Sequence, residues 1–193
     1  MRSIGKKTIS ALVFAALLGA AGAAKALEVA GVKVEERVQT AGKTLTLNGA
    51  GLRTKLFFKV YVAALYVEKP SREATAVISS PGARRVVLSM LRELDAETLY
   101  GALEEGLRNN LTDAERAVLK TSIEALAATM RAIGKVLPGD TVTLDFSADG
   151  LAIAHNGKPK GRIADEGIGP AVLKVWLGEK PAEESLKQAL LGH

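Results

Sequence analysis

Two polar side chains in and just before an aromatic-rich apolar stretch have the chemistry of an anion-binding site. Arg53 comes just before this stretch, and Tyr61 lies inside it. A guanidinium can bind a carboxylate through two parallel hydrogen bonds, and a phenol can add a third donor. The pair therefore predicts a site for the charged head of an amphiphile. The alternative is that both are ordinary surface residues paired with nearby acids.

The stretch 56–67, LFFKVYVAALYV, is predicted to be a β-strand because aromatic and β-branched residues dominate it. Side chains in a strand point alternately to its two faces. Strict alternation places Phe57, Tyr61 and Leu65 on one face and leaves a nearly all-apolar second face for the core. We therefore expect Phe57 and Leu65 to form part of an apolar wall beside Arg53 and Tyr61.

Strands and turns are predicted to make up much of the structure around this site. The run Asn48–Gly51 predicts a turn just before Arg53, because Asn and Gly tolerate positive φ angles. The pair Asn156-Gly157 predicts a hairpin for the same reason. Further strands are predicted from β-branched or alternating residues at 29–38, 43–47, 76–79, 84–90, 141–146, 151–155 and 161–164.

Helices are predicted between and after these strands. Asp95 is a suitable N-cap, and leucines then recur every four residues. Thr112 and Glu115 form a capping-box pattern ahead of a long amphipathic helix. Two shorter helices are predicted to begin at Pro170 and Pro181. This order of strands and helices predicts an α+β domain in which helices cover an antiparallel sheet.

The first 26 residues predict a cleaved signal peptide. Basic residues at the start precede the apolar run 9–18, and Ala24-Lys25-Ala26 matches a signal peptidase site. We therefore expect a signal peptide over residues 1–26 and a single mature domain over residues 27–193. The mature domain is predicted to be exported, to the periplasm if the source is Gram-negative, with no transmembrane anchor after processing.

Composition excludes several other kinds of chemistry. The 193 residues include no Cys, so disulfides, thiol catalysis and Cys-ligated metals are excluded. The two His residues, His155 and His193, lie far apart, so we expect no metal site, and nothing demands an organic cofactor. Removing the four basic residues of the leader from 26 leaves 22 basic residues against 21 acidic ones. A nearly neutral domain is not expected to bind nucleic acid.

Long motifs in the sequence resemble the chalcone isomerase family, and most closely its bacterial exported members. They span nearly the whole predicted mature chain: LNGAGLR (47–53), FFKVYVAALYVE (57–68), LSMLRELDAETLYGALEEGL (88–107), DTVTLDF (140–146), DGLAIAHNGKPKG (149–161) and AVLKVWLGEKPAEESLKQALLG (171–192). The resemblance implies an open-faced β-sandwich, a large antiparallel sheet with a layer of helices.

Function is divided within the family that the sequence resembles. Plant chalcone isomerases close a flavanone ring, and they hold the reacting oxyanion with an Arg that matches Arg53. Their other polar site positions align with Tyr61, Leu99, Gly106, Val175 and Trp176. Most donors that would stabilise an enolate are therefore replaced. An Arg and a Tyr at the positions of Arg53 and Tyr61 instead resemble the non-catalytic, fatty-acid-binding members of the family.

We therefore expect an exported, non-catalytic protein that binds a fatty acid or similar amphiphilic carboxylate in an apolar cleft. Leu99, Leu103, Val175 and Trp176 are further candidates for its wall, with plain core packing as the alternative. Two other functions remain open. One is an isomerase, an intramolecular lyase that closes a phenolic enone with Arg53 as its catalytic residue. The other is a ligand-free protein whose helical face docks on an envelope partner.

Overall fold

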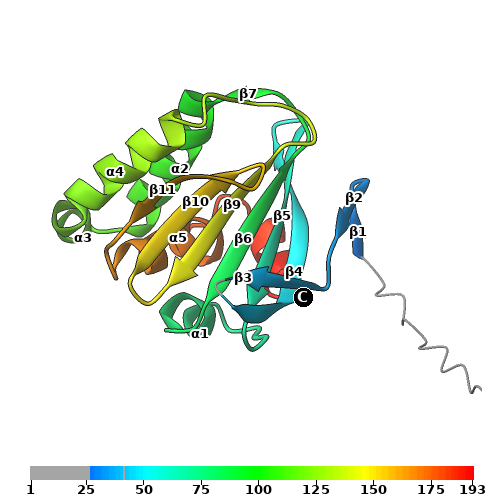
Figure 1. Ribbon diagram of the computed structural model, residues 1–193, viewed down its shortest axis with the longest axis horizontal. Helices are drawn as coiled ribbons and strands as arrows, with labels where there is room; N and C mark the ends of the chain where they lie inside the picture. Colours follow the sequence, from blue (N-terminus) through cyan, green and yellow to red (C-terminus); the bar gives the residue numbers. More distant parts are fainter. Residues whose placement is uncertain (1–26, 41) are drawn as a thin grey trace, which may run out of the picture.

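The computed structural model of the protein describes residues 27–40 and 42–193 (Figure 1). The predicted signal peptide, residues 1–26, lies outside the described residues, so its cleavage and the export of the chain stay predictions. Within the described residues, no helix is long and apolar enough to cross a membrane.

A seven-stranded antiparallel sheet forms the centre of the fold. Its strands follow the order β11-β10-β9-β6-β5-β4-β3. Their bounds are β3 Arg37–Thr40, β4 Lys43–Lys55, β5 Phe58–Val67, β6 Arg84–Met90, β9 Thr141–Ser147, β10 Gly150–His155 and β11 Lys158–Ile163. Two small two-stranded sheets form separate hydrogen-bonded ladders, β1 (Leu27–Val29) with β2 (Val32–Val34) and β7 (Leu94–Asp95) with β8 (Lys135–Val136). The predicted α+β class is confirmed.

Helices lie on one face and along the ends of this sheet (Figure 1). They are α1 Ala74–Ser79, α2 Ala96–Asn110, α3 Asp113–Val118, α4 Lys120–Arg131, α5 Ile168–Leu177 and α6 Glu184–Leu190. The Asp95 carboxylate accepts the Thr98 N–H at 2.6 Å, and the Thr112–Glu115 capping box starts α3. Both caps agree with the sequence, although the helix predicted after Thr112 is divided into α3 and α4.

Both faces of β5 are buried, and the larger core lies on the face of Tyr61. Tyr61, Ala63 and Leu65 belong to the main core between the sheet and the helices. Val62 and Tyr66 point the other way into a smaller cluster that includes residues of β2, β3 and β4. The second face is core, as the sequence predicts, and the first face is buried as well, because the N-terminal strands and the helices each cover one side.

The segment 76–79 is the end of helix α1 rather than the predicted strand. Four apolar residues do not distinguish the two periodicities, so neighbouring groups decide the outcome. Here the Arg84 guanidinium donates hydrogen bonds to the carbonyl oxygens of Val77 at 3.1 Å and Ile78 at 2.8 Å. A cation at this end satisfies free carbonyls and complements the helix dipole.

The run Asn48–Gly51 is continuous strand within β4 rather than the predicted turn. Its glycines allow helix α6 to approach the strand closely. A Cβ atom on Gly49 would lie 2.0 Å from the Ala189 carbonyl oxygen, and one on Gly51 would lie 2.7 Å from the Ala189 Cβ. Arg53 is therefore carried on a long strand against which the C-terminal helix α6 packs.

Candidate functional site

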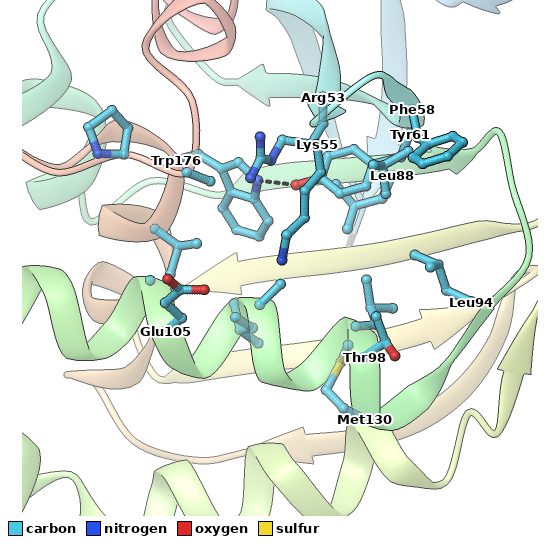
Figure 2. Close-up of a pocket in the computed structure, with 18 of the residues that line it drawn as sticks. Arg53, Lys55, Phe58, Tyr61, Leu88, Leu94, Thr98, Glu105, Met130 and Trp176 are labelled. Carbon is cyan, nitrogen blue, oxygen red and sulfur yellow. Dashed lines mark hydrogen bonds between the residues drawn. The ribbon is translucent and has the colours of Figure 1, made fainter.

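A cavity of about 540 Å³ lies between the sheet and helices α2 and α5 (Figure 2). Most of its lining is apolar and comes from strands β5, β6 and β9 and helices α2, α4 and α5. These apolar residues are Val60, Leu88, Leu144, Leu99, Ala102, Leu103, Met130, Val175 and Trp176. The loop after α5 closes one side with Lys180, Pro181 and Ala182.

Arg53 and Tyr61 lie directly opposite each other on β4 and β5, and both line this cavity. Directly paired residues in an antiparallel ladder place their side chains on the same face. The structure therefore brings together the two residues that the sequence analysis paired. The phenol and the guanidinium meet at one end of the apolar cavity (Figure 2).

The Tyr61 hydroxyl accepts a hydrogen bond from Trp176 Nε1 at 3.0 Å. Burial raises the pKa of the Tyr61 phenol, although the hydrogen bond from Trp176 and the positive charge of Arg53 act in the opposite direction. The phenol is therefore neutral at physiological pH. The hydroxyl hydrogen has no acceptor among the described residues, so it is left to be donated.

The Arg53 guanidinium forms a salt bridge with Glu183, with Nη1 and Oε2 3.0 Å apart. The same Nη1 donates to the Thr54 carbonyl oxygen, and Glu183 Oε2 also accepts the Thr54 N–H at 2.8 Å. Burial acts to raise the pKa of the Glu183 carboxyl, but hydrogen bonds from Thr54, Ser185 and Arg53 outweigh it, so the pKa is lowered. Glu183 is therefore an ionised carboxylate that holds Arg53 in place.

Phe57 and Leu65, the two predicted wall residues, do not line this cavity. Phe57 is 96% exposed in the turn between β4 and β5, and Leu65 is fully buried in the main core. The register of β4 and β5 shifts between Arg53 and Thr54, which adds one residue to β5 next to Tyr61. Such a bulge interrupts strict alternation. Phe58, rather than Phe57, consequently lies at the cavity.

Charged and polar residues surround the mouth of the cavity. Lys55 and Arg92 line it from the sheet side, and Thr98 and Glu105 line it from helix α2. The Arg92 guanidinium lies over the Phe58 ring, 4.5 Å from the ring centroid. The mouth is therefore cationic on the side of the β4–β5 turn.

Every position that the family resemblance singled out also lies at this cavity. Leu99 and Gly106 line it from α2, and Val175 and Trp176 line it from α5. Gly106 allows the two helices to pack closely, because a Cβ there would lie 2.5 Å from Val175 Cγ1. Leu103, the other wall candidate, lines the cavity as well.

Glu183 is the functional residue that sequence reasoning missed. It is 130 residues from Arg53 along the chain, and its segment reads as an ordinary helix start. Arg92 was missed as well, since a single Arg after a strand has no motif. In the residues that the structure describes, no group of three or more His, Cys, Asp or Glu side chains could hold a metal ion.

Comparisons with known proteins agree with this architecture. The family model described as chalcone isomerase-like matches residues 26–192. Among solved structures, the fatty-acid binding protein AtFAP1 of Arabidopsis thaliana is similar, with a TM-score of 0.66 and 15% identity over 83% of this chain and 92% of that chain. At that identity the likeness shows the fold. The curated proteins gave no match. Because the family model covers nearly all of the described residues, the chain belongs to the chalcone isomerase-like family.

Proposed function

We propose that the protein binds a fatty acid or a similar amphiphilic carboxylate without transforming it. The observation that carries the proposal is the Arg53–Tyr61 pair at one end of an apolar cavity. Ligand sites are typically apolar cavities of roughly 300–1,000 Å³ with a few placed polar groups. This cavity fits that description, with a cation and a neutral phenol as its polar end. Export of the protein is part of the proposal and depends on residues 1–26.

The head group would bind the free side of the Arg53 guanidinium. Nη1 is used by Thr54 and Glu183, whereas among the described residues Nε and Nη2 of Arg53 form no salt bridge. These two nitrogens present the parallel donors that a carboxylate accepts in a bidentate pair. The Tyr61 hydroxyl, oriented by Trp176, supplies a third donor.

The alkyl chain would occupy the apolar part of the cavity between β6, β9, α2 and α5. Leu88, Leu103 and Leu144 line that region and offer no hydrogen bond that a polar substrate would need. AtFAP1, a fatty-acid-binding protein by its title, has the same fold, which supports this class of ligand. The space beside Arg53 also argues against a ligand-free protein with a fully packed interior.

The isomerase alternative lacks most of its polar groups in this cavity. Leu99, Gly106 and Val175 line the cavity, and by the sequence resemblance they occupy positions at which the family's isomerases bind their substrate. A reaction through an enolate needs donors placed where charge develops. Tyr61 and Arg53 remain, so the experiment below includes an assay for enone ring closure.

The proposal is tested by measuring fatty acid affinity with isothermal titration calorimetry over chain lengths from octanoate to stearate. Arg53→Ala removes two charge-assisted hydrogen bonds, and we expect roughly 100-fold or more weaker binding, because such bonds contribute about 1.5–3 kcal/mol each. Arg162→Ala is the matched control, since Arg162 pairs with Asp149 on the surface.

Unchanged affinity of Arg53→Ala would show that the head group binds elsewhere. A wild-type protein that binds no fatty acid, but closes a phenolic enone in a reaction that Arg53→Ala abolishes, would establish the isomerase instead. Native mass spectrometry of the purified protein complements both assays, because it identifies a carboxylate that is retained through purification.

A further inference from the structure

The tip of the β4–β5 hairpin exposes three consecutive apolar side chains. Leu56 is 82% exposed, Phe57 96% and Phe58 55%. Scattered single apolar residues are normal on a protein surface, but a contiguous group marks an interaction site. The backbone at Leu56 is also unusual, because its φ of 57° is a conformation that favours Gly or Asn. A bulky apolar residue therefore occupies a position where turn geometry alone favours a small or polar one.

Cationic side chains surround this apolar tip. Lys55 and Lys59 flank it in the sequence, and the Arg92 guanidinium lies over the Phe58 ring. In the described part of the chain, none of these three cations forms a salt bridge, in contrast to Lys43, which pairs with Glu68. An apolar tip with unpaired cations beside it complements a surface that is anionic outside and apolar within.

The tip is also part of the cavity mouth. Lys55, Leu56, Phe58 and Arg92 all line the cavity that holds Arg53 and Tyr61. Figure 2 shows Lys55 reaching across the opening from the sheet towards helix α2. A surface on which the tip rests would therefore lie directly beside the entrance to the cavity.

We propose that the β4–β5 tip, residues 55–59 with Arg92, docks the protein reversibly on the surface of an anionic lipid bilayer. Leu56 and Phe57 enter the boundary between head groups and acyl chains, and Lys55, Lys59 and Arg92 contact lipid phosphates. Interfacial binding of this kind combines a small apolar insertion with attraction to anionic lipids. Docking would place the cavity entrance beside the bilayer, where a lipid-derived ligand could enter. That role rests on the proposed function, whereas docking itself does not.

Vesicle flotation tests the docking directly. The protein is mixed with vesicles of phosphatidylcholine containing 30% phosphatidylglycerol, or of phosphatidylcholine alone. Mass spectrometry first determines the N-terminus of every sample, so that an uncleaved leader is not mistaken for the tip. We expect binding to the anionic vesicles and little binding to the neutral ones.

Two variants separate the apolar and the charged contributions. Phe57→Ser is expected to reduce partition into anionic vesicles at least tenfold. Val118→Ser is the matched control, because Val118 is 83% exposed on helix α3, and its partition should equal that of the wild type. Lys59→Gln should reduce partition by roughly fivefold at low salt, in line with the contribution of one basic residue near an anionic membrane.

The proposal would be overturned if the wild type did not bind anionic vesicles, or if Phe57→Ser and Val118→Ser lost partition into them equally. It would also be overturned if light scattering showed a lipid-free dimer that Phe57→Ser dissociates. Phe57 does not line the cavity, so Phe57→Ser should keep wild-type fatty acid affinity in vesicle-free buffer. An Arg53→Ala variant that no longer binds fatty acid but still floats with anionic vesicles would support both proposals. Tip-dependent flotation of a protein that binds no fatty acid would reject the proposed function alone.

Discussion

The indole N–H of Trp176 donates a 3.0 Å hydrogen bond to the hydroxyl oxygen of Tyr61, and both side chains are buried at the end of the cavity. This bond connects helix α5 to strand β5 and determines what the phenol can do. Its oxygen accepts this bond, and its own hydrogen has no acceptor among the described residues, so the hydrogen is available to a ligand oxygen. Tyr61 therefore acts as an oriented donor.

Tyr61→Phe tests that role. We expect roughly tenfold weaker binding of a carboxylate, because a donor to a charged group is lost. We also expect a loss of about 1–3 kcal/mol in the free energy of unfolding, because the buried Trp176 N–H is left without an acceptor. Calorimetry and urea unfolding measure the two effects.

Tyr66→Phe is the matched control, since Tyr66 is buried on the opposite face of β5 and does not line the cavity. It should leave ligand affinity unchanged. A double-mutant cycle of Tyr61→Phe with Trp176→Phe should show coupling in stability, because the two changes together leave no unpaired partner. Additive effects would contradict the importance of this bond.

Glu183→Gln should strengthen the binding of an anionic ligand. The change removes a negative charge beside Arg53 and keeps an oxygen that can accept the Thr54 N–H. The Glu183 carboxylate and a ligand carboxylate bound to the same guanidinium would repel each other even near a protein surface. We therefore expect at least about threefold higher affinity at low salt. Glu184→Gln, on the neighbouring exposed residue, should change little. Weaker binding by Glu183→Gln would mean that holding Arg53 in place outweighs the repulsion.

Two glycines of helix α2 should respond oppositely to the same substitution. Gly101→Ala should stabilise the protein by about 0.5–1 kcal/mol, because a Cβ there meets nothing within 4 Å and Ala favours the helix. Gly106→Ala gains the same preference but places its Cβ 2.5 Å from Val175 Cγ1. Overpacking costs about 1–3 kcal/mol, so the net effect is destabilising.

Thermal unfolding of the two glycine variants measures the difference. Gly106→Ala combined with Val175→Ala should recover part of the helical gain, since the second change removes the methyl groups that clash. A Gly106→Ala protein as stable as Gly101→Ala would show that α2 and α5 separate easily at the cavity.

Acid should weaken the protein partly through Asp140. Hydrogen bonds from the Asn156 side chain and the Leu137 N–H, with His155 Nε2 at 3.1 Å, lower the pKa of the Asp140 carboxyl to about 2. A pKa that is lower in the folded than in the unfolded protein stabilises the fold above about pH 4. That stabilisation is lost as the pH falls from about 4 to about 2.

Asp140→Asn should therefore lower Tm at pH 7 and show a smaller further decrease between pH 4 and 2 than the wild type. Circular dichroism melts at several pH values give both quantities. Asp113→Asn, on the exposed start of α3, should retain the wild-type profile. Some acid sensitivity should persist in Asp140→Asn, because hydrogen bonds from Thr112 and Lys174 also lower the pKa of Glu115 to about 2.

The part of the site that local sequence could predict is the pair on neighbouring strands. Arg53 and Tyr61 are only eight residues apart, and a single hairpin brings them together. The alternation rule failed at Phe57 because a bulge beside Tyr61 shifts the register, and a bulge leaves no signal in residue type. The turn predicted at Asn48–Gly51 failed for another reason, since its glycines serve the close approach of α6.

Long-range partners could not be predicted from the sequence. Glu183 reaches Arg53 only because α6 packs on β4, and nothing near residue 183 indicates that contact. The overall fold was predictable because caps, turns and periodicity agree along most of the chain. Helix α1 was missed because the Arg84 guanidinium that satisfies its last carbonyls comes from the following strand.

The candidate site joins early and late parts of the polypeptide, and this has a consequence for its biosynthesis. Arg53 and Tyr61 are made early, whereas Trp176 and Glu183 follow 115 and 130 residues after their partners. Contacts of such separation carry a loop-closure cost that slows folding. A nascent chain therefore has no complete site until α5 and α6 have been synthesised and have packed against the sheet.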